Sequence, residues 1–599
     1  MTDISFEEAK SEHKPPITEG MNSLQLEDLI LGGESYSRSF LDNVPTDPFR
    51  WLSDFSPHPS TSSSGTRSIR EENAIKLGDI FHNKEQLKDV MKQFALQKGF
   101  QYTINKSDTK RWNIRCKAKN CQWYISASKS KVGEVFQIIK MNSTHTCSVD
   151  QKVSHQRQVG TGVLGQLIRS KYVLIDRIYR PKEIIVDIAD RYKIDISYSQ
   201  AWRARNWALN SLKGSPEESF MLLPDYCYNL QRSNPGTVTA IETDDAHRFK
   251  YFFMALGCSI CAFRKYLRPV ICIDAAFLKS QYLGHLFFAV GRDGNNQIYP
   301  IGFGVGKKED HDTWCWFLRK IKECIHEIPE LVIISDRHHA IYSAMVEVFP
   351  NVHHEYCCHH LLCNMRAKYK QNSKVVGAYW KAAKSYTETN FKAMMQSLDT
   401  MNPQAGAYLR EVGFERWSRA HFSEHRYNIM TTNIAESFND FVKHARGLPI
   451  TMLAEFIRGT LQRWFYERRN HANKCPNFVT PWMEEKISRR LSKSARLKVR
   501  SITPHRYQVI AFGGYMGIVD SDEMSCTCKK FQLSHIPCEH VVAVTRYMSF
   551  TNVNTWVHPF FQTEFYRAIY EKSVNPLGNQ LEWLYAPEER VILPPVFDS

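Results

Sequence analysis

The segment from residue 250 to residue 360 constrains the fold of this 599-residue chain more than any other part. Four successive apolar, β-rich runs read YFFMALGCSICAF, RPVICIDAAF, HLFFAVGR and QIYPIGFGVG, and they predict neighbouring strands. HDTWCWFLRKIKECI then predicts a helix, LVIISD a strand, HHAIYSAMVEVFP a second helix and VHHEYC a further strand. Buried strands that alternate with helices are typical of a mixed α/β sheet, so we expect a multidomain α/β protein.

Three acidic residues occupy places where such a sheet exposes side chains. Asp274 ends the run RPVICID, Asp336 ends LVIISD, and Glu436 lies in TTNIAESFNDFVKHAR, which predicts a helix capped near Thr432 or Asn433. Carboxylates at the C-terminal ends of buried strands lie where α/β active sites form. Three carboxylates in one pocket repel each other unless cations intervene. Two Mg²⁺ or Mn²⁺ ions, about 3.5–4 Å apart, are the usual arrangement for phosphoryl transfer.

The order of these elements adds weight to the acidic trio. A strand with Asp, two more strands, a helix, a strand with Asp and a later helix with Glu is the order of an RNase H-like nuclease core. Each acid alone has an ordinary structural explanation, because Asp often ends strands and Glu is common on helices. We therefore expect an RNase H-like mixed sheet core with a helical insertion, flanked by two small zinc-binding modules.

Two groups of cysteine and histidine have the spacing of zinc ligands. The first reads C-x4-C-x23-H-x-C and comprises Cys116, Cys121, His145 and Cys147. The second reads C-x-C-x9-C-x-H and comprises Cys526, Cys528, Cys538 and His540. Tetrahedral zinc sites use four such ligands, and in each group two local pairs supply them. We expect two structural Zn²⁺ ions; the alternative is buried core cysteines beside a chance histidine.

The charge of the chain favours a polyanionic partner. Lys and Arg number 78 against 62 Asp and Glu, which gives a formal net charge of +16. Basic residues that can neutralise phosphates cluster around the first cysteine pair: Lys106, Lys110, Arg111, Arg115, Lys117 and Lys119. Each of these residues alone could simply be a solvated surface residue, but as a group they favour contact with double-stranded DNA. Trp112, Trp123 and Tyr124 are expected in the core rather than stacked on bases.

Membrane and secretory segments are not expected. No run of eighteen apolar residues occurs, and the start MTDISFEEAKSEHK lacks an apolar signal region. The 16 cysteines are then expected in a reducing compartment, as metal ligands or core residues rather than disulfides.

Two further cysteine pairs are weaker signals. Cys357 and His360 form a C-x-x-H at the start of an expected helix, which is half of a zinc site, and we expect a structural or substrate-positioning role. Cys258 and Cys261 form a C-x-x-C that we expect on a strand, packed in the core.

These blocks together resemble the Mutator-like (MuDR-type) transposases of plants, from about Leu77 to Pro595. RPVICIDAAFLKSQYLGHLFFAVGRDGNNQIYPIGFGVG looks like the first-Asp block of that family, HDTWCWFL like its Trp helix and IISDRHHAIYSAMVEVFP like its second-Asp block. HHEYCCHHLLCNM is similar to its Cys-x-x-His motif, and TTNIAESFNDFVKHARGLPI looks like its Glu block. The first zinc group resembles a WRKY/GCM-type finger and the second a SWIM finger.

The resemblance implies a DDE transposase. Asp274 would bridge two metal ions, and Asp336 and Glu436 would each hold one, for DNA cleavage and strand transfer at terminal inverted repeats. Ala276 stands where the family more often has Thr. The resemblance also implies a nuclear protein that is a homo-oligomer. A domesticated DNA-binding transcriptional regulator remains the main alternative, and a zinc-dependent RNA nuclease or adaptor a third.

The expected domain boundaries follow from these blocks. They are a disordered segment at 1–74, a zinc-finger DNA-binding domain at 75–150, a helical linker at 151–245, a DDE core at 246–470 with its insertion at about 365–425, a basic helical linker at 471–505, a SWIM finger at 506–550 and an extension at 551–599.

Overall fold

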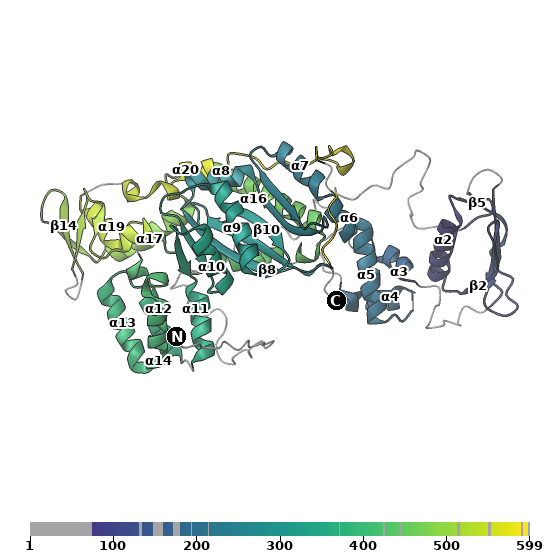
Figure 1. The fold of residues 1–599 in the computed structure, drawn as a ribbon, viewed down its shortest axis with the longest axis horizontal. Coiled ribbons are helices and arrows are strands. Elements are labelled where there is room, and N and C mark those ends of the chain that lie inside the picture. The colour runs from purple at the N-terminus through teal and green to yellow at the C-terminus, as the bar shows by residue number, and fades with distance from the viewer. Residues whose placement is uncertain are drawn as a thin grey trace. The chain divides into compact units, whose positions relative to one another are not determined.

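The computed structural model gives the fold of most of the chain (Figure 1). It describes residues 75–130, 135–147, 160–169, 171, 180–192, 194–213, 215–369, 372–422, 426–443, 445–511, 516–548, 553–588 and 591–596. The expected disordered segment at 1–74 lies outside the described residues. Two compact units divide the chain. The sheet unit comprises Pro45–His354, Thr432–Lys493 and Phe550–Ser599, and the helical–zinc unit includes Glu355–Thr431 and Ser494–Ser549.

A seven-stranded sheet forms the centre of the fold, in the order β12-β11-β8-β9-β10-β7-β6. Its strands are β6 (Val238–Thr243), β7 (Phe249–Ala255), β8 (Val270–Phe277), β9 (His285–Arg292), β10 (Ile298–Gly306), β11 (Val332–Ser335) and β12 (His353–Tyr356). The strands from β6 to β8 pair antiparallel, whereas β11 pairs parallel with β8. The expected mixed α/β sheet is therefore confirmed.

Helices cover both faces of this sheet. They include α8 (Gly257–Tyr266), α9 (His311–Ile325), α10 (His339–Val348), α15 (Asn433–Val442) and α16 (Ile450–Lys474). α20 (Thr563–Ile569) packs against α8 and α16, and α17 (Pro481–Ser494) follows α16 in the chain. Figure 1 shows α9 and α10 beside β8 and β10. α9 approaches β10 closely because glycine recurs there: a Cβ on Gly304 would lie 2.8 Å from the ring of Phe317. On the opposite face, Phe438 of α15 packs on Phe288 and Phe303.

Two sequence expectations about elements in the sheet unit are wrong. YFFMALGCSICAF is not one strand: it divides into β7 and α8, so Cys258 and Cys261 lie on a helix. Gly257 opens that helix against the carbonyl of Pro235, where a Cβ would clash at 2.2 Å. An apolar run buried on all sides has no period that separates strand from helix. The expected packing role for the pair agrees with the burial of Cys258.

The N-terminal part of the sheet unit contains a second sheet and several helices. Five antiparallel strands have the order β1-β5-β4-β3-β2. The elements are β1 (Ile80–Phe81), α2 (Lys84–Gln97), β2 (Tyr102–Ser107), β3 (Arg111–Cys116), β4 (Tyr124–Lys129), β5 (Phe136–Asn142), α3 (Thr161–Arg169), α4 (Pro181–Tyr192), α5 (Tyr198–Lys213), α6 (Pro216–Met221) and α7 (Leu223–Ser233). Trp112 and Trp123 are buried under α2 in one apolar cluster.

The helical–zinc unit has two parts. The first is a helical group, α11 (Cys358–Lys368), α12 (Ser373–Ala383), α13 (Glu388–Met401) and α14 (Pro403–Val412), which packs around Trp417 and Tyr379. The second is a four-stranded sheet of β13 (Lys498–Ser501), β14 (Arg506–Ile510), β15 (Met516–Asp520) and β16 (Ser525–Cys526), with α18 (Lys530–Ser534) and α19 (Glu539–Tyr547). The expected basic helix ends at Ser494, and KVRS instead forms β13. Among the described helices, none has the length and apolar character to cross a membrane.

Candidate catalytic and metal-binding sites

The strand register relates Asp274 to Asp336. β8 and β11 run parallel, and the last paired residues are Cys272 and Ile334. Asp274 lies two residues beyond Cys272 on β8, and Asp336 lies two residues beyond Ile334, directly after the end of β11, so an extension of the register would set them side by side. Both side chains are half-buried. Asp336 Oδ1 accepts a hydrogen bond from the backbone N–H of His338 at 3.0 Å, and Asp274 Oδ1 accepts one from that of Ala275 at 2.9 Å.

Glu436 lies on the helix that covers the same face of the sheet. Asp274 pairs directly with Phe288 across β8 and β9, so their side chains point to one face. The ring of Phe288 lies 5.4 Å from that of Phe438, two residues after Glu436 on α15. α15 also packs against β8 itself. The half-buried Glu436 thus belongs to a helix packed over Asp274.

The three carboxylates do not form a single tight cluster. Among the described residues, no group of three or more ligand side chains whose ligand atoms all lie within 4.8 Å of one another contains these three carboxylates together. The strand register and the helix packing bring their elements together on one face, and the catalytic role of the three side chains stays a prediction.

Glu309, in the loop before α9, is a fourth carboxylate in this region. Asp310 is the cap of α9, because its Oδ1 accepts from the backbone N–H of Thr313 at 3.0 Å. Glu309 is half-buried, and burial raises the pKa of its carboxyl. The charge of Asp336 raises that pKa further, while His338 lowers it. Glu309 therefore lies within electrostatic reach of Asp336, which its place in a loop before α9 did not reveal.

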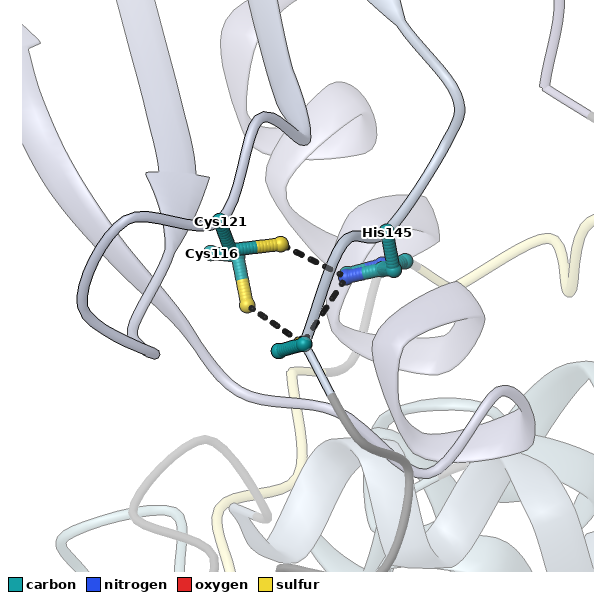
Figure 2. A group of neighbouring side chains, drawn as sticks. Cys116, Cys121 and His145 are labelled. Atoms are coloured by element: carbon teal, nitrogen blue, oxygen red, sulfur yellow. Dashed lines mark hydrogen bonds between the residues drawn. The ribbon is translucent and has the colours of Figure 1, made fainter.

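The first cysteine–histidine group converges as expected (Figure 2). The sulfur atoms of Cys116 and Cys147 are 3.9 Å apart, and His145 Nδ1 lies 3.4 Å from Cys121 Sγ and 3.7 Å from Cys147 Sγ. Tetrahedral zinc with bonds of about 2.3 Å to sulfur and 2.05 Å to nitrogen requires about 3.8 Å and about 3.6 Å. The ligand spacing thus fits zinc.

The local fold of this group explains its geometry. Cys116 ends β3, Cys121 follows the turn to β4, and His145 stacks on the indole of Trp123 at 5.2 Å. Burial raises the pKa of the Cys116 thiol to about 12. Burial also acts to raise the pKa of Cys121, but N–H groups of Trp123 and Thr146 and the side chains of Cys147 and His145 lower it to about 5. A thiolate among these ligands is the form that binds a metal ion.

The second group also converges, in the helical–zinc unit. Cys526 ends β16, Cys538 caps α19 and His540 lies in the first turn of that helix. His540 Nδ1 is 3.4 Å from Cys526 Sγ, and one ligand atom of each of the four residues lies within 4.8 Å of the others. Burial lowers the pKa of His540, but Cys528 and Cys538 raise it to about 10. The sulfur atoms therefore stabilise a positive charge at the centre of this four-residue group, and a zinc ion would supply that charge.

The basic residues near the first group lie on exposed positions of β2 and β3 or in the turns beside these strands. Along β3, Trp112, Ile114 and Cys116 point into the core, whereas Arg111 and Arg115 are exposed. All of the six predicted DNA-binding residues are exposed: Lys106, Lys110, Arg111, Arg115, Lys117 and Lys119. The predicted core position is confirmed for Trp112 and Trp123 but wrong for Tyr124, which is 42% exposed.

The C-x-x-H pair lies at a helix start, as predicted. Cys357 is the buried N-cap residue of α11, and His360 is half-buried in its first turn. The next residue, Cys358, is sealed in the helical core, where its thiol donates to the carbonyl of Trp417 at 3.3 Å. The expected structural or positioning role for Cys357 and His360 stays a prediction.

Comparison with known families agrees with this arrangement. Residues 270–364 match the MULE transposase domain, residues 72–138 match the MuDR family transposase model and residues 513–547 match the SWIM zinc finger. The mixed sheet and the two metal-type clusters thus define a multidomain protein built from transposase-family domains. The chain thus carries domains of the Mutator-like transposase family and, towards its C-terminus, a SWIM zinc finger.

Curated relatives are distant. FAR1-RELATED SEQUENCE 4 of Arabidopsis thaliana is 21% identical over 365 residues, which cover 54% of this chain and 49% of the relative. The transposase for insertion sequence element IS256 in transposon Tn4001 of Staphylococcus aureus is 26% identical over 206 residues, covering 32% and 52%. FAR-RED IMPAIRED RESPONSE 1 of Arabidopsis thaliana is 20% identical over 406 residues, covering 61% and 48%. The chain spans about half the length of each of these relatives.

Proposed function

We propose that this transposase or transposon-derived protein is a DDE transposase with an RNase H-like core. The observation that carries the proposal is the parallel register of β8 and β11, whose extension by two residues reaches Asp274 and Asp336, together with the packing of α15 over the face of Asp274. In the strand order β10-β9-β8-β11-β12, the strand of the first Asp, β8, ends an antiparallel meander with β9 and β10 on one side and pairs with the parallel strand β11 on the other. This order supports an RNase H-like core.

The donor set suits hard divalent cations. Carboxylate oxygens are the side-chain ligands that Mg²⁺ and Mn²⁺ prefer, and Asp274, Asp336 and Glu436 would hold two of them. Bound ions of this kind activate an attacking oxygen and stabilise a leaving one. In this proposal Asp274 would contribute a ligand to both ions, and Asp336 and Glu436 would each contribute a ligand to one. β8, the end of β11 and α15 carry the three carboxylates towards one face of the sheet, where they would hold the ions next to the DNA backbone.

The N-terminal zinc domain is proposed to bind the terminal inverted repeats of a transposon. Its surface carries the exposed basic residues, and their phosphate contacts predict a steep fall in affinity with salt. Arg115→Ala should reduce the slope of log K against log salt by about one unit. Lys88→Ala on α2, where Lys88 pairs with Glu85 at 2.6 Å, is the matched control and should leave the slope unchanged. If the unmutated chain, Arg115→Ala and Lys88→Ala all gave the same slope, this basic surface would not be the DNA-binding surface.

Nuclear localisation and a homo-oligomer complete the proposal. DNA as partner requires access to the nucleus, and joining two transposon ends requires at least two catalytic units. Fluorescence imaging of the tagged chain and mass photometry with paired-end DNA test these two points.

A second candidate is a DNA-binding regulator that no longer transposes. It is favoured by the similarity to two Arabidopsis thaliana proteins whose names refer to FAR1 and to the far-red response rather than to transposition. The similarity to the IS256 transposase favours the enzyme instead.

A metal-dependent cleavage assay separates the two candidates. The full chain is incubated with Mg²⁺ or Mn²⁺ and a supercoiled plasmid that carries its selected binding sites, and nicked and linear products are measured. Asp274→Asn and Glu436→Gln should each lower the rate by roughly 10²-fold or more, a typical loss for a group that stabilises transition-state charge. Asp440→Asn, an exposed acid on the same helix as Glu436, should cut normally. Cleavage that persists in Asp274→Asn would refute the proposal of a DDE transposase. DNA binding without cleavage by the unmutated chain would support the proposal of a regulator.

A further inference from the structure

A third group of metal-type side chains lies in the sheet unit, away from the two cysteine-rich clusters. His311 and Cys315 are one turn apart on α9, and Glu347 lies near the end of α10. One ligand atom of each lies within 4.8 Å of the others. Residues at i and i+4 share a helix face, so α9 presents nitrogen and sulfur together to the carboxylate on α10.

The hydrogen bonds around His311 indicate which of its two ring nitrogens carries the proton and which has a free lone pair towards this group. Ser343 Oγ lies 3.0 Å from the carbonyl oxygen of His339, to which its single hydroxyl proton can be donated. The same oxygen lies 2.9 Å from His311 Nδ1, and with its own proton donated to that carbonyl it can accept from the Nδ1–H. In the neutral imidazole this leaves a lone pair on Nε2, which is the state that a metal-binding histidine needs.

Nε2 of His311 then faces two further electron-rich atoms. It lies 3.1 Å from Glu347 Oε2 and 3.4 Å from Cys315 Sγ. Three such atoms at these distances repel each other unless a proton or a cation lies among them. A tetrahedral zinc ion requires about 3.4 Å between nitrogen and oxygen ligands and about 3.6 Å between nitrogen and sulfur ligands. The observed distances are within 0.3 Å of these values.

The carboxylate of Glu347 is oriented by a second partner. Its other oxygen, Oε1, forms an ion pair with Arg319, one helical turn beyond Cys315 on α9. Arg319 thereby holds Glu347 so that Oε2 points at the imidazole, as outer partners of metal ligands commonly do. The side chains of His311 and Glu347 are 42% and 46% exposed, so an ion and a water molecule can reach the group from solvent.

We propose that His311 Nε2, Cys315 Sγ and Glu347 Oε2 form a binding site for a zinc-type divalent cation. The Cys315 thiol releases its proton to solvent when the metal–sulfur bond forms, and water fills the fourth position. Three protein ligands with one open position distinguish this site from the two four-ligand clusters. The bound ion joins α9 to α10, the helix that follows Asp336. The site does not depend on the proposed catalytic function.

Zinc stoichiometry of the full chain tests the site. The protein is loaded with Zn²⁺, gel-filtered into metal-free buffer and measured by elemental mass spectrometry. His311→Gln and Cys315→Ser should each contain one zinc fewer per chain than the unmutated protein. Glu323→Gln and His326→Asn, exposed on the same helix and at its end, are the controls and should retain the full number.

Thermal unfolding with and without Zn²⁺ separates metal binding from a simple ion pair. The proposal requires added Zn²⁺ to raise the melting temperature of the metal-free protein more in the control variants than in Cys315→Ser. Circular dichroism of each variant verifies that it folds. An imidazolium–carboxylate pair would instead make His311→Gln less stable by the same amount with and without zinc. That result, or equal zinc content in Cys315→Ser and the unmutated chain, overturns the proposal.

Discussion

Phe438 is the residue that fixes α15, and with it Glu436, to the central sheet. Its side chain is 1% exposed. Its ring centroid lies 5.4 Å from those of Phe288 and Phe303 and 6.4 Å from that of Trp464. These neighbours come from β9, β10 and α16, and strand pairing holds two of them in place. We therefore expect that a cavity left by Phe438→Ala cannot collapse.

The expected cost follows from this geometry. Phe→Ala in a core costs about 3–5 kcal/mol, and a site that cannot collapse lies towards the upper end of that range. At about 1.4 kcal/mol for each factor of ten, amide exchange of α15 should accelerate by roughly 150- to 4,000-fold. Cleavage should fall in parallel, because Glu436 lies half a turn from the missing ring. DNA binding by the N-terminal domain should be unchanged.

Hydrogen exchange followed by mass spectrometry measures this effect peptide by peptide, without assuming that a multidomain chain unfolds in one step. Phe277→Ala is the matched control, since Phe277 lies on β8 but is 68% exposed, and it should change stability by less than about 0.5 kcal/mol. Exchange in α15 that accelerates less than tenfold in Phe438→Ala would refute the reasoning that this ring anchors the helix.

Three further outcomes are expected. Gly306→Ala should destabilise the sheet unit by about 1–3 kcal/mol in chemical denaturation, because the new Cβ would lie 2.6 Å from Thr313 Cγ2; an unchanged midpoint would contradict that contact. Asp310→Ala should cost about 1 kcal/mol through loss of the α9 cap, whereas Asp310→Asn should retain most of it, and both are measured in the same titration. Chelation of zinc should unfold the N-terminal domain and abolish specific DNA binding while the central sheet keeps its exchange protection; binding that survives in chelator or in Cys121→Ser would show that zinc is dispensable there.

Local patterns in the sequence were enough for much of the fold. Apolar runs of strand length predicted β8, β9, β10 and β11, and ligand spacing predicted both cysteine–histidine clusters, because a strand period and a pair of nearby ligands are properties of a few adjacent residues. The prediction was wrong where a local pattern is ambiguous. The apolar run around Cys258 divides into strand and helix.

Relations between distant residues were decided by the tertiary structure alone. The register of β8 with β11 relates Asp274 to Asp336, and burial beside Asp336 gives Glu309 an electrostatic role that its loop position did not suggest. The grouping of His311 and Cys315 with Glu347 needs two helices packed side by side. The sequence by itself determines the helix or strand on which each of these residues lies, because that depends on the neighbouring residues in the chain. Their distances depend on how strands pair and helices pack over long separations, which no local pattern encodes.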